Sequence, residues 1–287
     1  MALGGSRWTA RKHQGQSQAA SATFLLSIIS PRVDKMPQAY LKSMQWLLTG
    51  MCVTLLAACA GMPDQTPIDY AAIIAAQDRS AADRTNDVRR KAVQLIAFTG
   101  VRPGMRVLDV ATGGGYSTEL MARGVAPTGI VYGQDAPNSN AGARTAFEAR
   151  FKTPAMKNVV RYLRPFDDPV PMEVRDLDLI TFFFEYHEMP RAGIDFEKMN
   201  RRLFDILKPG GVLVIADHSA LPGTGGEMGP SLHRIEEAYV RKHIEAAGFK
   251  LIEEGNFLRS PADKRDGAVF RNTVPNDEFL LKFQKPR

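Results

Sequence analysis

Short, nearly continuous apolar runs alternate with longer segments in which apolar residues recur at helical spacing. The runs predict buried strands, and the segments between them predict helices. Strands that are apolar throughout are typical of a mostly parallel sheet covered on both faces. The strands are expected at 106–110, 130–134, 159–163, 177–184, 212–217, 250–254 and 279–283. Helices are expected at 68–99 with a break at 78–80, after the first strand as far as residue 123, and at 141–151, 196–207 and 235–247.

A glycine-rich turn directly follows the first predicted strand. The run Val107–Val110 leads into three consecutive glycines, Gly113–Gly115, and an apolar helical start follows with Leu120 and Met121. Glycines let the chain turn sharply and let a ligand approach the backbone amides closely. In an α/β sheet such a turn is the usual place for a nucleotide-like ligand, although a turn without a ligand stays an alternative. The spacing differs from the G-x-G-x-x-G pattern of dinucleotide sites.

The residues of this turn, Asp109-x-Ala111-x-Gly113-x-Gly115, resemble motif I of the class I S-adenosylmethionine-dependent methyltransferases. Ala111 stands where that motif, D/E-x-G-x-G-x-G, has its first glycine. Three further segments resemble the second, fourth and fifth strands of the family, in order and at matching intervals. They are 131–135, 177–187 and 208–217, and the resemblance covers about residues 85–285.

The resemblance implies S-adenosylmethionine as the cofactor and an α/β, doubly wound, mostly parallel seven-stranded sheet with a C-terminal antiparallel strand, the Rossmann-like methyltransferase fold. Asp109 would hold the turn near the methionine ammonium, and Asp135 would accept hydrogen bonds from the ribose hydroxyls. Structural roles stay open as alternatives for three of these residues. Asp135 could cap a helix, Asp167 could be a solvated acid in a loop, and Phe183 could be a core residue. The cofactor-binding residues implied are Asp109, Ala111, Gly113, Gly115, Tyr116, Asp135, Asp167 (adenine edge) and Phe183 (methionine tail).

Three histidines follow predicted strand ends or the glycine-rich segment after the fifth strand, and we expect them to face one pocket. Neutral histidine is suited to remove a proton from a methyl acceptor, because its pKa lies near neutral pH. We predict His218 as the first choice for this base, then His187, with His233 nearby and with Glu185 and Tyr186 as supporting polar groups.

Two other interpretations of these residues stay open. Each histidine can be purely structural, and a metal could bind His187, Asp217, His218 and His233. We predict no metal, because their spacing is not a local motif of the HExxH type. Arg234 is expected either to pair with an acidic substrate or to cap its helix.

The charge distribution argues against a nucleic-acid partner. The formal net charge is +6, but residues 1–58 hold Arg7, Arg11, Lys12, Arg32, Lys35 and Lys42 against Asp34 alone. The rest of the chain is therefore nearly neutral, whereas a protein that binds the phosphate backbone carries a basic surface.

The N-terminal segment has the pattern of an export signal. Lys42 precedes the apolar run 46–56, and Leu56-Ala57-Ala58-Cys59 resembles a bacterial lipobox with Cys59 as the acylated residue. A transmembrane anchor, or cleavage after Ala58 without a lipid, stays an alternative. The run is shorter than the about 20 residues that span a membrane. We interpret 1–35 as an over-extended start or disordered leader, 36–58 as the signal peptide, 59–67 as a tether and 68–287 as a single methyltransferase-like domain.

Segments 217–220, 222–226, 232–235 and 261–263 resemble a bacterial subgroup of methyltransferases, often exported or lipoproteins, whose substrate is unknown. We therefore expect a methyltransferase acting on a small molecule or envelope component, anchored to the bacterial membrane through Cys59 and facing the periplasm. The alternative is an exported lipoprotein that keeps the fold as a binding or structural module without catalysis, because S-adenosylmethionine is made in the cytosol. A hydrolase or metal-dependent enzyme on the same sheet is the third possibility, and the sequence assigns no oligomeric state.

Overall fold

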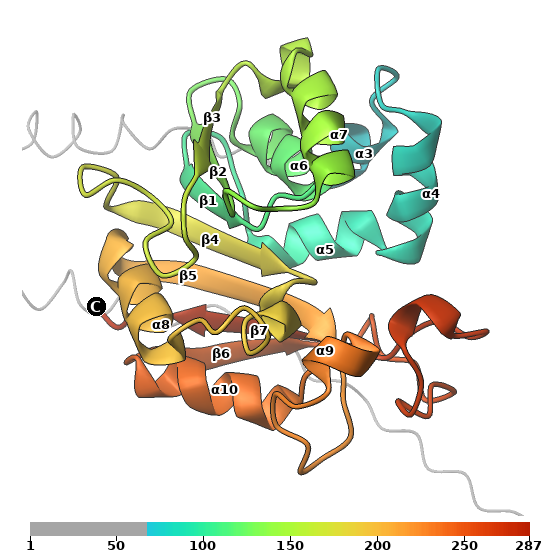
Figure 1. The fold of residues 1–287 in the computed structure, drawn as a ribbon. Coiled ribbons are helices and arrows are strands. Elements are labelled where there is room, and N and C mark those ends of the chain that lie inside the picture. Colours follow the sequence, from blue (N-terminus) through green and yellow to red (C-terminus); the bar gives the residue numbers. More distant parts are fainter. Residues whose placement is uncertain (1–67) are drawn as a thin grey trace, which may run out of the picture. The chain divides into compact units, whose positions relative to one another are not determined.

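One sheet with the strand order β3-β2-β1-β4-β5-β7-β6 organises the computed structural model, which describes residues 68–287 (Figure 1). The pairs β1–β2, β1–β4, β2–β3 and β4–β5 are parallel, and β7 runs antiparallel to both β5 and β6. This confirms the predicted seven-stranded, mostly parallel sheet with its C-terminal antiparallel strand. The strands are β1 (Arg106–Val110), β2 (Ile130–Asp135), β3 (Val159–Leu163), β4 (Leu177–Phe183), β5 (Leu207–His218), β6 (Lys250–Gly255) and β7 (Glu278–Gln284).

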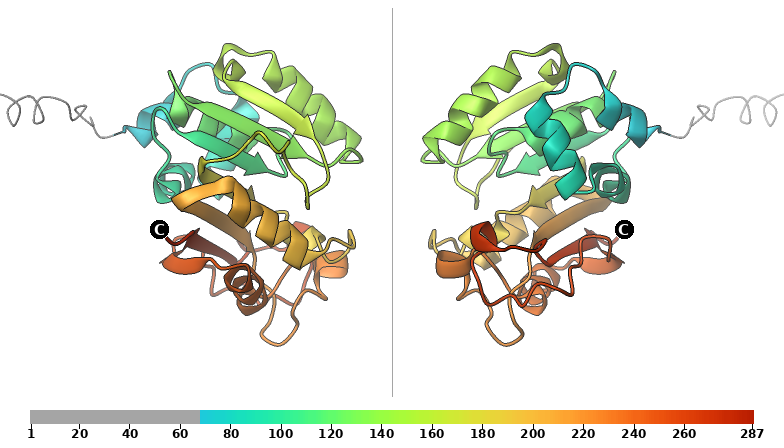
Figure 2. Two further views of the ribbon diagram at one scale, coloured as in Figure 1. Left: turned by 90° about the vertical axis from the view of Figure 1, so that its left-hand side faces the viewer. Right: turned by 90° about the vertical axis from the view of Figure 1, so that its right-hand side faces the viewer.

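Helices cover the sheet in two groups, each with its own apolar cluster. Leu95, Met121 and Phe147 come from helices of the first half of the domain and pack in one cluster, whereas Leu203 and Ile244 belong to the other. The two groups stay separate in both side views (Figure 2). The helices are α3 (Tyr70–Ala75), α4 (Ala81–Arg89), α5 (Ala92–Thr99), α6 (Tyr116–Val125), α7 (Ala141–Phe151), α8 (Phe196–Ile206), α9 (Gly229–Leu232) and α10 (Glu237–Ala246), with short 3-10 turns η2 (Pro154–Met156), η3 (Tyr186–Glu188) and η4 (Val269–Arg271).

Most predicted boundaries agree with the structure to within two residues, and two larger differences remain. The helix expected up to residue 99 is interrupted between α4 and α5, where Lys91 adopts a left-handed conformation with φ of 46°. The fifth strand begins at Leu207 rather than at residue 212, because the turn before it pairs irregularly with β4. The helical spacing of apolar residues cannot show that one residue within it is left-handed. An irregular strand start also lacks the apolar pattern by which a strand is recognised.

The parallel strands bring their carboxyl ends to the same edge of the sheet. The residues that follow β1, β2, β4 and β5 therefore lie along that edge, although they are far apart in the sequence. Within residues 68–287, no helix has the length and apolar character needed to cross a membrane. The predicted leader, signal peptide, lipobox and tether lie outside the described residues.

Candidate functional site

The glycine-rich turn joins β1 to α6 with three residues in the left-handed region. Ala111, Gly113 and Gly115 have φ of 59°, 50° and 82°. A Cβ atom on Gly115 would lie 3.0 Å from the Phe147 ring and 3.1 Å from the Arg150 side chain, both on α7. Glycine is therefore required at 115 by conformation and by packing. Ala111 adopts the same region at a cost of about 1–2 kcal/mol, since its Cβ crowds the backbone there.

Asp109, near the end of β1, holds the start of α6 through side-chain hydrogen bonds. Its carboxylate is fully buried and accepts hydrogen bonds from the hydroxyls of Ser117 at 2.9 Å, Thr118 at 2.7 Å and Thr181 at 2.6 Å. Burial raises the pKa of Asp109, and the three hydroxyls act in the opposite direction. These contacts fit the predicted role of Asp109 in holding the turn, whereas its proximity to a methionine ammonium stays a prediction.

Asp135, at the end of β2, offers an unused acceptor. Its Oδ1 atom accepts a hydrogen bond from the backbone N–H of Ala136 at 2.8 Å, and its Oδ2 atom is buried with no partner among the described residues. Burial raises the pKa of this carboxyl group. A buried, unpaired carboxylate oxygen is costly unless a ligand pairs with it, and a ribose hydroxyl is a suitable donor.

The other predicted cofactor residues have different surroundings. The hydroxyl of Tyr116 donates to Asp87 at 2.6 Å, and Asp167 pairs with Lys198 of α8 at 2.6 Å. Phe183 packs into the core cluster, and its neighbour Phe184, with φ of 60°, lines the cleft described next. The chain leaves β4 at this point, so Phe184 departs from the regular alternation of side chains along the strand. Contact of Phe183 with a methionine tail stays a prediction.

A cleft of about 700 Å³ opens at the ends of β4 and β5. It contains all three predicted histidines: the rings of His187 and His218 are 5.8 Å apart, and those of His187 and His233 are 5.5 Å apart. The fold thus assembles residues that are up to 46 positions apart in sequence, and their catalytic roles stay predictions. The lining residues are Arg89, Arg90, Asn140, Phe184, Glu185, His187, Glu188, Arg191, His218, His233, Val269, Phe270 and Asn276.

His187 is held by carboxylates on both sides of its ring. Its Nδ1 atom lies 2.7 Å from Asp217 Oδ1, its Nε2 atom lies 3.4 Å from Glu188 Oε1, and its backbone N–H donates to Asp217 Oδ2 at 2.8 Å. Burial alone would lower the pKa of His187, but Asp217 and Glu188 raise it to about 10. Without a further cation, His187 therefore carries a proton at neutral pH and is a poor base.

His218 and Glu185 are the remaining groups for proton transfer. The Nδ1 atom of His218 lies 3.1 Å from Glu278 Oε1, and its ring packs 5.3 Å from that of Phe184. Burial raises the pKa of Glu185 to about 7, with His187 opposing the shift. Of the three histidines, His218 best suits the predicted role of base, because it is not enclosed by two carboxylates.

The predicted roles of Tyr186 and Arg234 are wrong. Tyr186 faces the core, where its hydroxyl accepts a hydrogen bond from the Asn200 amide at 2.9 Å. Arg234 is fully buried, pairs with Asp263 at 2.9 Å and donates to the Gly267 carbonyl at 2.9 Å. It therefore neither caps a helix nor meets a substrate, and instead ties the C-terminal loop to the sheet. The sequence could not show this, because the pairing loop lies 29 residues downstream.

Arg90 is a cleft residue that the sequence analysis missed. Its guanidinium lies over the rings of Phe184, at 4.5 Å, and Tyr116, at 5.2 Å, and its Nε atom is buried without a partner among the described residues. Burial, then repulsion from Arg89, lowers the pKa of Arg90 to about 10, so it stays charged at neutral pH. The break between α4 and α5 turns it inward. The only sequence signal was a cation inside a basic run, which is usually an exposed helix face.

Comparison with known proteins gives a consistent relationship. Residues 85–225 match the model of the ubiE/COQ5 methyltransferase family. The chain is 27% identical over 168 residues to the ubiquinone/menaquinone biosynthesis C-methyltransferase UbiE of Ectopseudomonas mendocina, covering 58% of this chain and 60% of that protein. It is 32% identical over 120 residues to a demethylmenaquinone methyltransferase of Staphylococcus aureus, covering 42% of this chain and 46% of that protein. The chain thus matches 60% or less of the length of these relatives.

Solved structures share the fold. A SAM-dependent methyltransferase from Aquifex aeolicus matches with a TM-score of 0.50 and 20% identity, covering 76% of this chain and 99% of that one. The [4+2]-cyclase SpnF matches with a TM-score of 0.51 and 17% identity, covering 72% and 81%. Since one of these two proteins is a cyclase, the fold alone does not define the reaction.

Proposed function

We propose that this chain is a class I S-adenosylmethionine-dependent methyltransferase, as the family match and the shared fold suggest, and that it methylates a small aromatic acceptor that carries a hydroxyl group. The names of its relatives suggest a quinol-type ring as the acceptor. The cleft is compatible with this choice, because Phe184, Val269 and Phe270 give its otherwise polar lining an apolar part and His218 supplies a base. A flat ring that carries polar groups suits a site with both kinds of lining residue.

The observation that carries the proposal is the unpaired Oδ2 atom of Asp135 beside the glycine turn. Together with the turn at Ala111–Gly115, it provides an acceptor for ribose hydroxyls and a backbone that a ligand can approach closely. The cleft lies at the same edge of the sheet. Bound S-adenosylmethionine supplies an electrophilic methyl group there. The residues of the chain have to bind and orient the acceptor and remove one proton.

His218 performs the proton transfer in this proposal. It accepts the proton of the acceptor hydroxyl, so the electron pair of the oxygen enters the ring and makes the adjacent carbon nucleophilic. A bond from that carbon to the methyl group forms as the carbon–sulfur bond breaks. Water then accepts the ring proton at that carbon, which restores the aromatic ring, and His218 returns its proton to the ring oxygen. Phe184 is buried and lies in the wall of the cleft beside the reacting groups.

Cofactor binding tests the proposal most directly. Calorimetry should show that the wild-type chain binds S-adenosylmethionine, and that Asp135→Asn weakens binding by about 10- to 100-fold, the value of a charge-assisted hydrogen bond. Asp176→Asn is the matched control, since this exposed aspartate precedes β4 at the opposite edge of the sheet. A folded wild-type chain that does not bind at millimolar cofactor contradicts the proposal.

Transfer of a labelled methyl group separates catalysis from binding. With a reduced quinol lacking one ring methyl as the acceptor, wild type should give a labelled product, and His218→Asn should retain cofactor binding but lose at least about 100-fold in rate, the usual contribution of a general base. Binding without transfer to any hydroxylated acceptor would instead favour the non-catalytic binding module.

We further propose that the protein is anchored in the bacterial envelope through lipid on Cys59, facing the periplasm. The support is the lipobox-like sequence 56–59 after a basic and apolar segment. A palmitate analogue supplied to cells should label the wild-type chain and not Cys59→Ser. Equal labelling of both chains overturns the proposal.

A further inference from the structure

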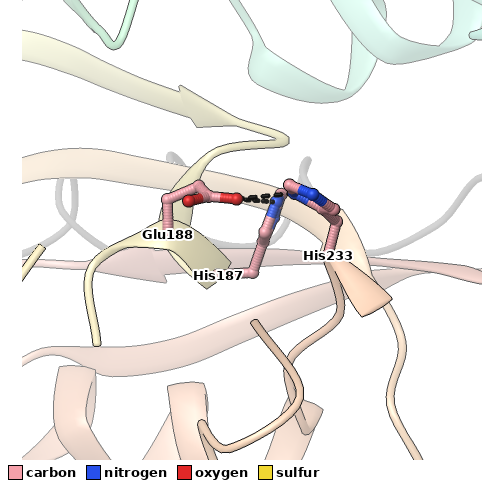
Figure 3. A group of neighbouring side chains, drawn as sticks. All are labelled: His187, Glu188 and His233. Carbon is pink, nitrogen blue, oxygen red and sulfur yellow. Dashed lines mark ion pairs between the residues drawn. The ribbon is translucent and has the colours of Figure 1, made fainter. Parts of the chain in front are cut away.

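Three side chains with metal-binding atoms converge at one end of the cleft. His187 and Glu188 come from η3, directly after β4, and His233 follows α9 (Figure 3). Their ligand atoms, one nitrogen from each histidine and one carboxylate oxygen, all lie within 4.8 Å of one another. We propose that His187, Glu188 and His233 bind a divalent transition-metal ion, with zinc as the best match to this ligand set.

The distances between these atoms suit a single ion. Ligand atoms bound tetrahedrally to zinc at about 2.0–2.2 Å lie roughly 3.3 Å apart. The separation of His187 Nε2 and Glu188 Oε1 is 3.4 Å. Glu188 Oε1 lies 2.6 Å from His233 Nδ1, and a small rotation of the carboxylate, whose side chain is 19% exposed, opens this distance. Two imidazoles and one carboxylate are a donor set that zinc and ferrous iron both take in proteins.

The carboxylate of Glu188 lies within ion-pair distance of His187, His233 and Arg191, but its Oε1 atom is poorly oriented toward them. Its Oε1 atom is buried, and despite the short distance to His233 it makes no well-directed hydrogen bond among the described residues. Nearby, Arg191 Nη1 lies 3.5 Å from Glu188 Oε2 on a side chain that is 61% exposed. The histidine nitrogens and the Glu188 carboxylate oxygen therefore lie close together without a well-directed hydrogen bond. This arrangement is expected where a metal ion binds all of them.

Asp217 provides the hydrogen-bond partner that the other ring nitrogen of a metal-binding histidine usually has. Its Oδ1 atom lies 2.7 Å from Nδ1 of His187, which leaves Nε2 of the same ring directed to the cluster. Asp217 is fully buried and also accepts the backbone N–H groups of His187 and His218, each at 2.8 Å. A carboxylate in this position fixes the ring and its tautomer for the metal. Asp217 is therefore a positioning residue.

Packing of α9 against η3 delivers the third ligand. Gly229, the first residue of α9, lies so close that a Cβ atom there would be 2.1 Å from the carbonyl oxygen of His187. His233 ends this helix in the left-handed region, with φ of 55°, and its ring contacts that of His187. The sequence analysis predicted no metal, because a carboxylate and a histidine 45 positions apart form no local motif; the fold joins them.

Three protein ligands leave a coordination position open toward the cleft. There the ion would bind the hydroxyl oxygen of the acceptor and lower its pKa, so that His218 removes the proton more readily. This role rests on the proposed methyl transfer, whereas metal binding itself does not. His218 is outside the three-residue cluster and stays available as the base.

Zinc binding to the full chain tests the proposal. Protein stripped with a chelator and dialysed is titrated calorimetrically with zinc chloride, in parallel with a Cys52→Ser/Cys59→Ser chain that removes both thiols. Both chains should bind one equivalent of zinc. His233→Asn and Glu188→Gln should each weaken binding by at least about 10-fold, and Asp217→Asn by about 10- to 100-fold, as outer-layer substitutions do. Bound cobalt(II) should give visible absorption bands that disappear in His233→Asn.

His243→Asn, in α10 and outside the cluster, is the matched control and should bind zinc like wild type. Unfolding midpoints show whether each variant is folded, and Glu188→Gln replaces His233→Asn if the latter is not. Absence of zinc binding by wild type, wild-type affinity in both ligand variants, or equal weakening in His243→Asn overturns the proposal. S-adenosylmethionine binding is measured separately with chelator present, so failure of the metal site and failure of the methyltransferase assignment are distinguished.

Discussion

The two halves of the site are built in different ways. In the cofactor half, Asp109 binds hydroxyls of Ser117 and Thr118, eight and nine residues downstream, and one continuous stretch makes the strand end, the turn and the helix start. In the acceptor half, the ends of β4 and β5, the residue after α9 and the C-terminal loop each contribute separately. The cofactor half therefore depends mostly on one continuous stretch, to which the sheet adds Thr181 of β4 and Asp135 of β2, whereas long-range packing assembles the whole acceptor half.

The two halves also differ in how their carboxyl groups are paired. The fully buried carboxylate of Asp109 is satisfied by three hydroxyl donors. The acceptor half holds the carboxyl groups of Glu185, Glu188 and Asp217 close to histidines. A satisfied anchor keeps one conformation, while a cluster of titratable groups can exchange protons or take up a cation. We infer that the first half fixes the cofactor and the second half determines the chemistry of the acceptor.

Removing the anchor of the cofactor half should have the largest effect. Asp109→Ala leaves three hydroxyls without their acceptor and should lower the free energy of unfolding by about 3 kcal/mol. It should also abolish S-adenosylmethionine binding but leave zinc binding intact if the halves are independent. Urea denaturation and calorimetry measure these effects, with Asp266→Ala, at an exposed position outside the left-handed region, as the control. Loss of both ligands in a folded variant would show that the two halves are coupled.

The difference between the halves also explains what the sequence could predict. The seven strands follow from apolar runs and the glycine turn from a local motif, whereas Asp135 was implied by the resemblance of residues 131–135 to a strand of the methyltransferases. None of these positions needs tertiary information. Arg90 and Glu188 were missed because a left-handed residue at Lys91 and the docking of α9 direct them to the cleft. Such turns and contacts depend on packing between distant segments, which periodicity does not encode.

Arg90 lies beside both halves and should show which ligand it serves. Arg90→Met keeps an apolar side chain beside Phe184 but removes the charge, and should weaken S-adenosylmethionine binding by about 10-fold if the guanidinium pairs with the cofactor carboxylate. Binding of 5′-methylthioadenosine, which has no carboxylate, should then be unchanged. Exposed Arg84→Met is the control. Unchanged cofactor affinity together with a slower methyl transfer would assign Arg90 to the acceptor instead.

The smallest effect, and the only favourable one, is expected at Ala111. Its φ of 59° costs an alanine about 1–2 kcal/mol, whereas glycine adopts this conformation freely but loses about 0.5–1 kcal/mol through the greater entropy of its unfolded chain. Ala111→Gly should therefore raise the free energy of unfolding by about 0.5–1 kcal/mol and leave cofactor affinity unchanged. Ala122→Gly, inside α6, should instead lower it by about 1 kcal/mol. If both variants are destabilised equally in urea, the Ala111 methyl group contributes packing that outweighs the relief of strain, and the turn is fixed by its contacts rather than by its backbone conformation.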